Sequence, residues 1–173
     1  MWQKYSFIKD KDLMRLFGFP LILFIFFSAF LYSQTSESSK SQLPLAFDEK
    51  RDPSVDLKYA VTLAKKEKKN ILLDVGGEWC IWCKRLDEFF EADTVLNNFL
   101  RQNFVVLKVN YSKENKNEKF LSKYPKVAGY PHFFVLNRNG RFLHSQNTGD
   151  LEAGKGYDLV KMMSFLKKWA PKK

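Results

Sequence analysis

The chain has 173 residues, the length of one domain, and its 45% hydrophobic content with 17 Phe is enough for a packed core. Two cysteines are too few for a disulfide-rich miniprotein. The net charge of +10 would suit an anionic partner, but the cations are scattered along the chain and form no zinc-finger, RNP-like or Arg-rich pattern. We therefore expect no nucleic-acid partner.

The N-terminal residues have the pattern of an export signal or a single membrane anchor. A basic stretch precedes 21 uncharged residues, 16–36, and a bilayer-spanning helix takes about 20. We expect a signal peptide or membrane anchor over 1–33, with anchoring through 16–32 if it is retained. A polar linker over 34–47 and a folded domain over 48–173 would follow. The basic end should stay in the cytoplasm, which puts the domain outside it.

The first half of the domain predicts two helices around a strand. Asp52 suits a helix cap and Pro53 the first helical position, and apolar residues follow at near-helical spacing. NILLDV is a short apolar run, as expected of a strand covered on both faces. CIWCKRLDEFFEA then places Cys83 and Leu86 on one stripe of a second helix, and DTVLNNFLRQ continues helically behind a cap at Asp93.

The second half predicts another buried strand at NFVVLKVN, a helix at ENKNEKFLSKY and an antiparallel hairpin from HFFVLN and RFLHSQN around the turn NRNG. GDLEAGKGYD is expected to be a flexible loop, and an amphipathic helix should run from about Tyr157 to Trp169 with Leu159 on its apolar side. This order favours an α/β fold with a central mixed β-sheet flanked by helices on both faces.

Both cysteines lie in the stretch DVGGEWCIWCK, 74–84. If Cys80 begins the second helix, Cys83 lies one turn on along the same face, with Cβ atoms about 5–6 Å apart and within reach of a disulfide. The positive helix start favours an anion on Cys80 and so lowers its pKa. Cys80 is therefore the candidate nucleophile, and Cys83 is the candidate resolving thiol.

ILLDVGGEWCIWCK resembles the active-site strand and helix start of the thioredoxin superfamily. KYPKVAGYPHFFVLNRNG is similar to that family's second signature, in which a Gly-x-Pro supplies a cis-proline opposite the cysteine pair, and LKVN resembles the strand between them. The resemblance covers about residues 50–170 and is closer to exported thioredoxin-like proteins with a Trp-Cys-x-x-Cys-Lys site than to cytosolic thioredoxin. The sequence departs from both at Ile81 and Trp82, where the strongly oxidising exported members have Pro-His, so we expect a less oxidising protein.

The resemblance implies the thioredoxin fold and thiol–disulfide oxidoreductase activity, with no cofactor beyond the dithiol. It implies protein thiols or disulfides and a redox protein as partners, and we expect a monomer in the bacterial periplasm, either secreted or anchored to the inner membrane. Asp74 would be a buried carboxyl that relays a proton to or from Cys83. Lys108 near Asp74, and Lys84 after the second cysteine, would support the site. The residues implied to bind substrate are Trp79, Tyr130 and Pro131, the last as the cis-proline that leaves the preceding backbone free to pair with a peptide strand.

Three alternatives remain open at this point. A static structural disulfide would stabilise little, because the loop it closes is short. Cys80, Cys83 and His132 could together hold copper in an assembly factor, whereas zinc would want four ligands and covalent haem attachment a His in place of Lys84. A non-catalytic binding module could use the cis-proline groove and merely retain the cysteines. We expect the oxidoreductase, with no resident metal.

Overall fold

A computed structural model describes residues 43–44 and 46–172. The expected signal or anchor segment over 1–33 lies outside these residues, as does most of the expected linker. The chain divides into the units Met1–Gln42 and Leu43–Lys173, and the second carries the fold described below. Within the described part, none of the helices is both long and apolar enough to cross a membrane.

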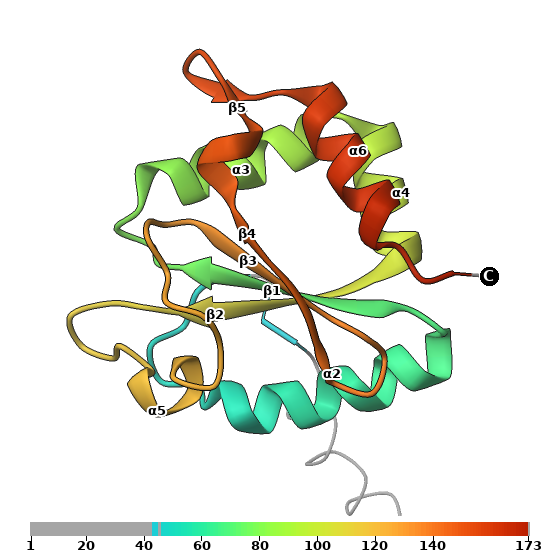
Figure 1. Cartoon of the computed structure of the whole chain (residues 1–173). Coiled ribbons are helices and arrows are strands. Elements are labelled where there is room, and N and C mark those ends of the chain that lie inside the picture. Colours follow the sequence, from blue (N-terminus) through green and yellow to red (C-terminus); the bar gives the residue numbers. More distant parts are fainter. Residues whose placement is uncertain (1–42, 45, 173) are drawn as a thin grey trace, which may run out of the picture. The chain divides into compact units, whose positions relative to one another are not determined.

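A four-stranded mixed sheet in the order β2-β1-β3-β4 forms the centre of this unit (Figure 1). Strand β1 pairs in parallel with β2 and antiparallel with β3, which in turn pairs antiparallel with β4. Every residue of β1 is buried, as the continuous apolar run predicts for a strand covered on both faces. The strands are β1 (Asn70–Gly76), β2 (Phe104–Asn110), β3 (His132–Leu136) and β4 (Phe142–Asn147).

Helices cover both faces of the sheet, which confirms the predicted architecture (Figure 1). On one face lie α2 (Pro53–Glu67) and the short α5 (Glu118–Leu121), and on the other α3 (Ile81–Ala92), α4 (Thr94–Asn103) and α6 (Leu159–Trp169). The predicted caps are present: the side chains of Asp52 and Asp93 accept the backbone N–H groups of Ser54 and Leu96.

Two predicted elements differ from the structure. The helix predicted at ENKNEKFLSKY is reduced to α5, because the side-chain amides of Asn110 and Asn117 bond backbone carbonyls and hold 111–117 as a loop beside the end of β2. The expected flexible loop GDLEAGKGYD instead forms a 3-10 helix (Thr148–Leu151) and a small hairpin of β5 (Glu152–Ala153) and β6 (Gly156–Tyr157). Its Leu151 and Tyr157 are buried in the core. Leu159, expected on the apolar side of α6, is 44% exposed.

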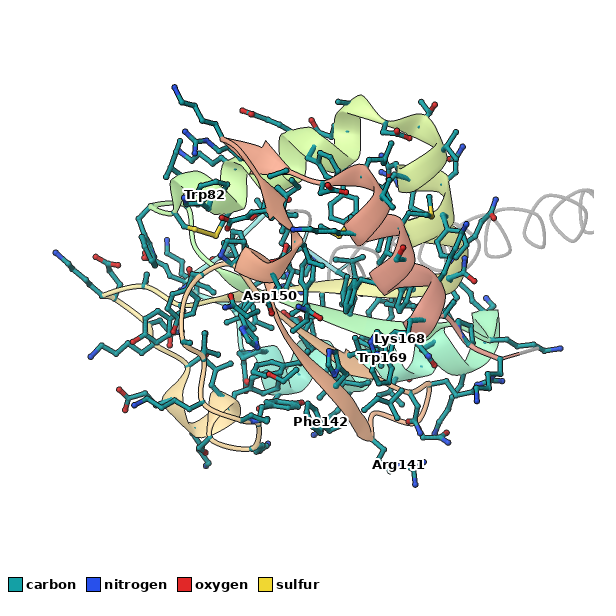
Figure 2. All side chains as sticks on the ribbon, turned by 45° about the horizontal axis from the view of Figure 1, so that its top comes forward. Trp82, Arg141, Phe142, Asp150, Lys168 and Trp169 are labelled. Carbon is teal, nitrogen blue, oxygen red and sulfur yellow. A yellow bond between two sulfur atoms is a disulfide. The ribbon has the colours of Figure 1, made fainter. Side chains whose placement is uncertain are left out.

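The strand directions give the domain two distinct ends (Figure 1). The cysteine end comprises residues 76–82, 111–117 and 129–131, where β1 and β2 finish and α3 begins. The far end comprises 65–70, 101–104, 137–142 and 167–172, where β1 and β2 begin and α2, α4 and α6 finish. Figure 2 shows Trp82 beside the disulfide at the first end and Arg141 at the second.

Candidate active site

The two cysteines stand at the start of α3, as predicted. Cys80 is the N-cap residue, with extended backbone, and its Sγ accepts the backbone N–H of Cys83 at 3.1 Å. The Cα atoms are 5.2 Å apart and the sulfurs are joined in a disulfide, so the structure is that of the oxidised form. Both residues are almost completely buried, with exposed fractions of 3% for Cys80 and 1% for Cys83.

This position gives the Cys80 sulfur a favourable electrostatic setting in the reduced form. The first-turn N–H groups of α3 and the positive end of its dipole point at the sulfur. The donated N–H of Cys83 adds a hydrogen bond that strengthens when its acceptor is charged. The arrangement can therefore stabilise a thiolate at Cys80 after reduction.

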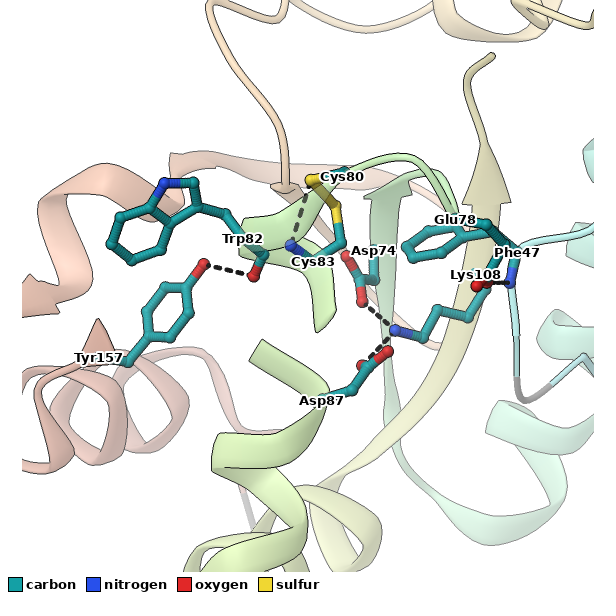
Figure 3. Close-up of polar contacts among 9 residues, drawn as sticks. All are labelled: Phe47, Asp74, Glu78, Cys80, Trp82, Cys83, Asp87, Lys108 and Tyr157. Atoms are coloured by element: carbon teal, nitrogen blue, oxygen red, sulfur yellow. Dashed lines mark hydrogen bonds and ion pairs between the residues drawn. A yellow bond between two sulfur atoms is a disulfide. The ribbon is translucent and has the colours of Figure 1, made fainter. Parts of the chain in front are cut away.

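A buried charged group lies beneath the disulfide (Figure 3). Asp74 on β1 is 4% exposed and accepts a hydrogen bond from Lys108 Nζ at 2.8 Å through Oδ2, whereas its Oδ1 has no partner among the described residues. Asp74 and Gly76 occupy successive inward positions of β1, and a Cβ added to Gly76 would meet the Cys83 sulfur at 2.5 Å. The absence of a side chain at Gly76 thus lets Cys83 lie against the strand, next to the carboxyl of Asp74.

Asp87 on α3 completes this group and was missed by the sequence analysis. It pairs with Lys108 from the side opposite Asp74, and its side chain is 42% exposed. A signal was available, because Asp87 is one helical turn beyond Cys83 on the same helix. Lys108 is therefore shared between a buried carboxylate and a half-exposed one.

The pKa directions follow from this sharing. Burial raises the pKa of Asp74, and the attraction of Lys108 offsets this only in part, while the charge of Asp87 raises it further. Burial lowers the pKa of Lys108, but the two carboxylates outweigh it and the net direction is upward. Lys108 thus stays charged, and Asp74, with one oxygen unpartnered in the interior, is the carboxyl that gains a proton most readily.

Phe47 covers this group and was also missed, since it falls in the expected linker over 34–47. Its ring packs with Cys80 and Cys83 in one buried cluster and lies 4.5 Å from Lys108 Nζ. Its backbone N–H donates to Glu78 Oε1 at 3.1 Å, which holds the segment against the loop before Cys80 (Figure 3). A weak signal was available, because Phe47 ends the short apolar run LPLAF, 43–47, within the expected linker.

An aromatic platform flanks the disulfide on its exposed side. Trp79 is 59% exposed, donates its Nε1–H to the carbonyl of Tyr111 at 2.7 Å and meets Tyr130 edge to face. Tyr130 in turn stacks on Tyr111 with ring centroids 4.5 Å apart. Gly77 makes this possible, because a Cβ there would come within 2.5 Å of the indole nitrogen. The platform therefore depends on the glycine that precedes Glu78.

The expected cis-proline is present: the Tyr130–Pro131 peptide is cis, and the Pro131 carbonyl accepts a hydrogen bond from the Thr148 hydroxyl. The predicted substrate residues Trp79, Tyr130 and Pro131 thus meet at the cysteine end. Lys84 does not join them, because its side chain is exposed on the outer side of α3.

His132 lies apart from the cysteines. Its ring packs on Phe134, on the α2 side of the sheet, and its Nε2 lies 2.8 Å from the Ser145 hydroxyl, whereas Cys83 lies against the other face. Burial lowers the pKa of His132 to about 4, so the ring is neutral at ordinary pH. Among the described residues no three His, Cys, Asp or Glu side chains converge as a metal site would require. The geometry therefore gives no support to the copper alternative.

Comparison with known proteins identifies the family. A family model described as thioredoxin-like matches residues 52–138, half of the chain. The chain belongs to this thioredoxin-like family. Its solved structural neighbours show the thioredoxin fold: the disulphide isomerase of Xylella fastidiosa Temecula1 superposes with a TM-score of 0.59 at 23% identity, covering 73% of this chain and 96% of that one. The C-terminal domain of Neisseria meningitidis DsbD in its oxidised form superposes with 0.51 at 17% identity, covering 68% and 96%.

Curated relatives of this thioredoxin-like chain are thiol:disulfide interchange proteins named DsbD. That of Actinobacillus pleuropneumoniae is 27% identical over 143 residues, covering 77% of this chain and 24% of the relative. That of Vibrio cholerae is 30% identical over 86 residues, covering 49% and 14%. The chain thus spans less than a quarter of the length of each of these relatives.

Proposed function

We propose that this thioredoxin-like domain is a thiol–disulfide oxidoreductase that exchanges the Cys80–Cys83 pair with disulfides or thiols of partner proteins. The observation that carries the proposal is the place of the Cys80 sulfur, which caps α3, accepts the Cys83 N–H and is bonded to its neighbouring sulfur. The naming of the curated relatives as thiol:disulfide interchange proteins supports the same activity.

In the reducing direction, the Cys80 thiolate attacks one sulfur of a substrate disulfide. The substrate S–S bond breaks, one substrate thiolate leaves and takes a proton, and Cys80 is left in a mixed disulfide. Cys83 then gives its proton to the Asp74 carboxylate and attacks the Cys80 sulfur. The bond between Cys80 and the substrate breaks, and the second substrate thiolate leaves and takes a proton. Two electrons have passed to the substrate, and the Cys80–Cys83 disulfide has formed. The same steps in reverse oxidise a substrate dithiol, and no cofactor takes part.

The surrounding residues have supporting roles in this proposal. Lys108 and Asp87 hold Asp74 in place and set its affinity for a proton, and the backbone beside Pro131 pairs with an extended substrate segment across the platform of Trp79 and Tyr130. The partner that restores the starting redox state is a second dithiol or disulfide protein. We propose that the chain acts as a monomer outside the cytoplasm, with 1–33 as its signal or anchor.

A trapping experiment tests this function. Cys83→Ala leaves Cys80 able to attack but removes the thiol that resolves the mixed disulfide, so partner proteins should remain attached through Cys80 and separate from it on reduction. Cys80→Ser with Cys83 intact is the matched control and should trap nothing. If Cys83→Ala, expressed in the native envelope, formed no reducible adducts, the proposed function would be wrong.

A further inference from the structure

Cations that are far apart in the sequence meet at the far end of the domain. The strand starts, the hairpin turn and the ends of α2, α4 and α6 all lie there, and each brings Lys or Arg. The cations of the far end are Lys65, Lys66, Lys68, Lys69, Arg101, Arg138, Arg141, Lys167, Lys168 and Lys172. Figure 2 shows Arg141 and Lys168 on this side of the molecule.

The far end carries the whole net charge of the described residues. Glu67 is the only acidic residue within its ranges. Ten cations against this one acid give +9, while the remaining described residues hold 13 Lys and Arg against 15 Asp and Glu, or −2. The dipoles of three helix ends supply only about −0.5 each, so they do not neutralise this charge.

The surface has a shape and an apolar component as well as charge. A hollow of about 520 Å³ is lined by Arg138, Arg141, Lys168 and Lys172 together with Trp169. Phe142, at the start of β4, is 39% exposed beside it, and Trp169 is half-buried (Figure 2). Basic side chains interspersed with Trp and Phe suit the headgroup region of a bilayer, which is anionic and partly apolar.

The described chain begins beside a cavity that reaches the far end. Leu43 and Pro44 line this cavity of about 450 Å³, which extends from Glu67, Lys69 and Arg101 at the far end to Asp74, Asp87 and Lys108 beneath the disulfide. In the sequence, ten residues, 33–42, separate Leu43 from the expected anchor 16–32. Fully extended, they span about 40 Å at most. If that anchor is embedded in a bilayer, Leu43 is therefore held within about 40 Å of the lipid surface.

We propose that the far end docks on anionic phospholipid headgroups. The cations bind lipid phosphates, and the short tether keeps the local lipid concentration high. Docking points the cysteine end away from the bilayer, because the two ends are separated by the length of β1, about 23 Å for seven residues. The disulfide would then face soluble partners.

Vesicle experiments on the full chain test the proposal. The chain is reconstituted with vesicles of phosphatidylcholine alone or of phosphatidylcholine with phosphatidylglycerol, and lysines are acylated briefly and identified by mass spectrometry. Lys65 and Lys167 at the far end should be acylated several-fold more slowly with phosphatidylglycerol, and 0.5 M salt should remove the difference. Lys116, at the cysteine end, should be acylated equally in both. Equal acylation of the far-end lysines in the two lipids would overturn the proposal.

Two variants that each lose four positive charges test whether the position of the charges matters or only the total charge of the protein. The test variant is Lys66→Gln, Arg141→Gln, Lys168→Gln and Lys172→Gln, and the control is Lys113→Gln, Lys119→Gln, Lys126→Gln and Lys155→Gln. Each removed far-end cation should weaken binding to phosphatidylglycerol about fivefold. In the test variant phosphatidylglycerol should therefore no longer slow the acylation of Lys65 and Lys167, whereas in the control it still should. The proposal that the far end binds lipid would be wrong if the two variants were acylated equally with phosphatidylglycerol. It would also be wrong if added RNA slowed acylation of the far-end lysines more than phosphatidylglycerol does.

Discussion

The two ends of the sheet differ in how they use charge. Beneath the disulfide the charges are few and paired: Lys108 is shared by the buried Asp74 and the half-exposed Asp87. At the far end they are many and mostly exposed, as at Lys168 and Arg141. A buried charge is held in place and changes the protonation of its neighbours, whereas exposed charges act together on a distant surface. The first arrangement suits chemistry at one bond, and the second suits docking.

The largest effect should come from Asp74→Asn, which removes the proton acceptor proposed for Cys83. We expect the release of a mixed disulfide to slow about 100-fold. In the native protein this step should gain rate as the pH rises through the raised pKa of Asp74, above the ordinary 3.8, because the carboxylate must be ionised to accept the proton. In Asp74→Asn this increase in rate with pH should be absent, and only the increase caused by ionisation of the Cys83 thiol should remain.

Stopped-flow release of a disulfide-bonded peptide, measured across pH, checks this expectation. Asp56→Asn is the matched control, since Asp56 is also buried and ion-paired, with Arg51, but lies on α2 away from the cysteines. A native-like pH profile in Asp74→Asn would show that Asp74 takes no part in the proton transfer.

The next largest effect should come from Phe47→Ala, which removes the ring that covers Cys80 and Cys83. Iodoacetamide should alkylate Cys83 in the reduced protein about tenfold faster, because the ring that packs on the cysteines is gone. The free energy of unfolding should fall by about 3 kcal/mol. Phe142→Ala removes the same atoms from the far end and should leave the alkylation rate unchanged; an equal increase in both variants would mean general loosening rather than lost cover.

A smaller effect is expected from Gly77→Ala. The added Cβ would lie 2.5 Å from Trp79 Nε1 and 2.9 Å from the Tyr111 carbonyl, so the hydrogen bond between them must break or shift. We expect disulfide exchange with a peptide to slow about fivefold, the value of one hydrogen bond of about 1 kcal/mol. Gly129→Ala is the control, since a Cβ there meets no atom within 4 Å. If the two variants exchanged disulfides at equal rates, the aromatic platform would have no role in the exchange.

The smallest effect should come from the far-end variant Lys66→Gln, Arg141→Gln, Lys168→Gln and Lys172→Gln. Exchange with a small soluble disulfide should stay within about twofold of the native rate, because exposed substitutions far from a site change little. The exchange rate is measured in detergent without lipid. A larger loss of rate would show that the far end affects the cysteine end, which would contradict their separate roles.

Much of the cysteine end could be predicted from the sequence, because its signals are local. The helix start at Cys80 depends on a few neighbouring residues, as do the Asp52 and Asp93 caps elsewhere in the domain. The cis peptide at Pro131 was implied by the thioredoxin resemblance, and the structure has all of these features. The helix predicted over 114–124 formed only over Glu118–Leu121 for the opposite reason: asparagine side chains from β2 and the loop itself compete for the backbone before it.

By itself, the sequence determined the order of elements and the short-range geometry of the cysteine pair, since both follow from hydrophobic period and from spacing along one helix. Only the tertiary structure decided that Phe47 covers the disulfide, that Asp87 shares Lys108 and that His132 faces away from the sulfurs. It also decided that cations scattered along the chain gather at one end. The physical reason is that β1 and β2 begin at the same end of the sheet where β3 turns into β4, so residues distant in sequence meet there.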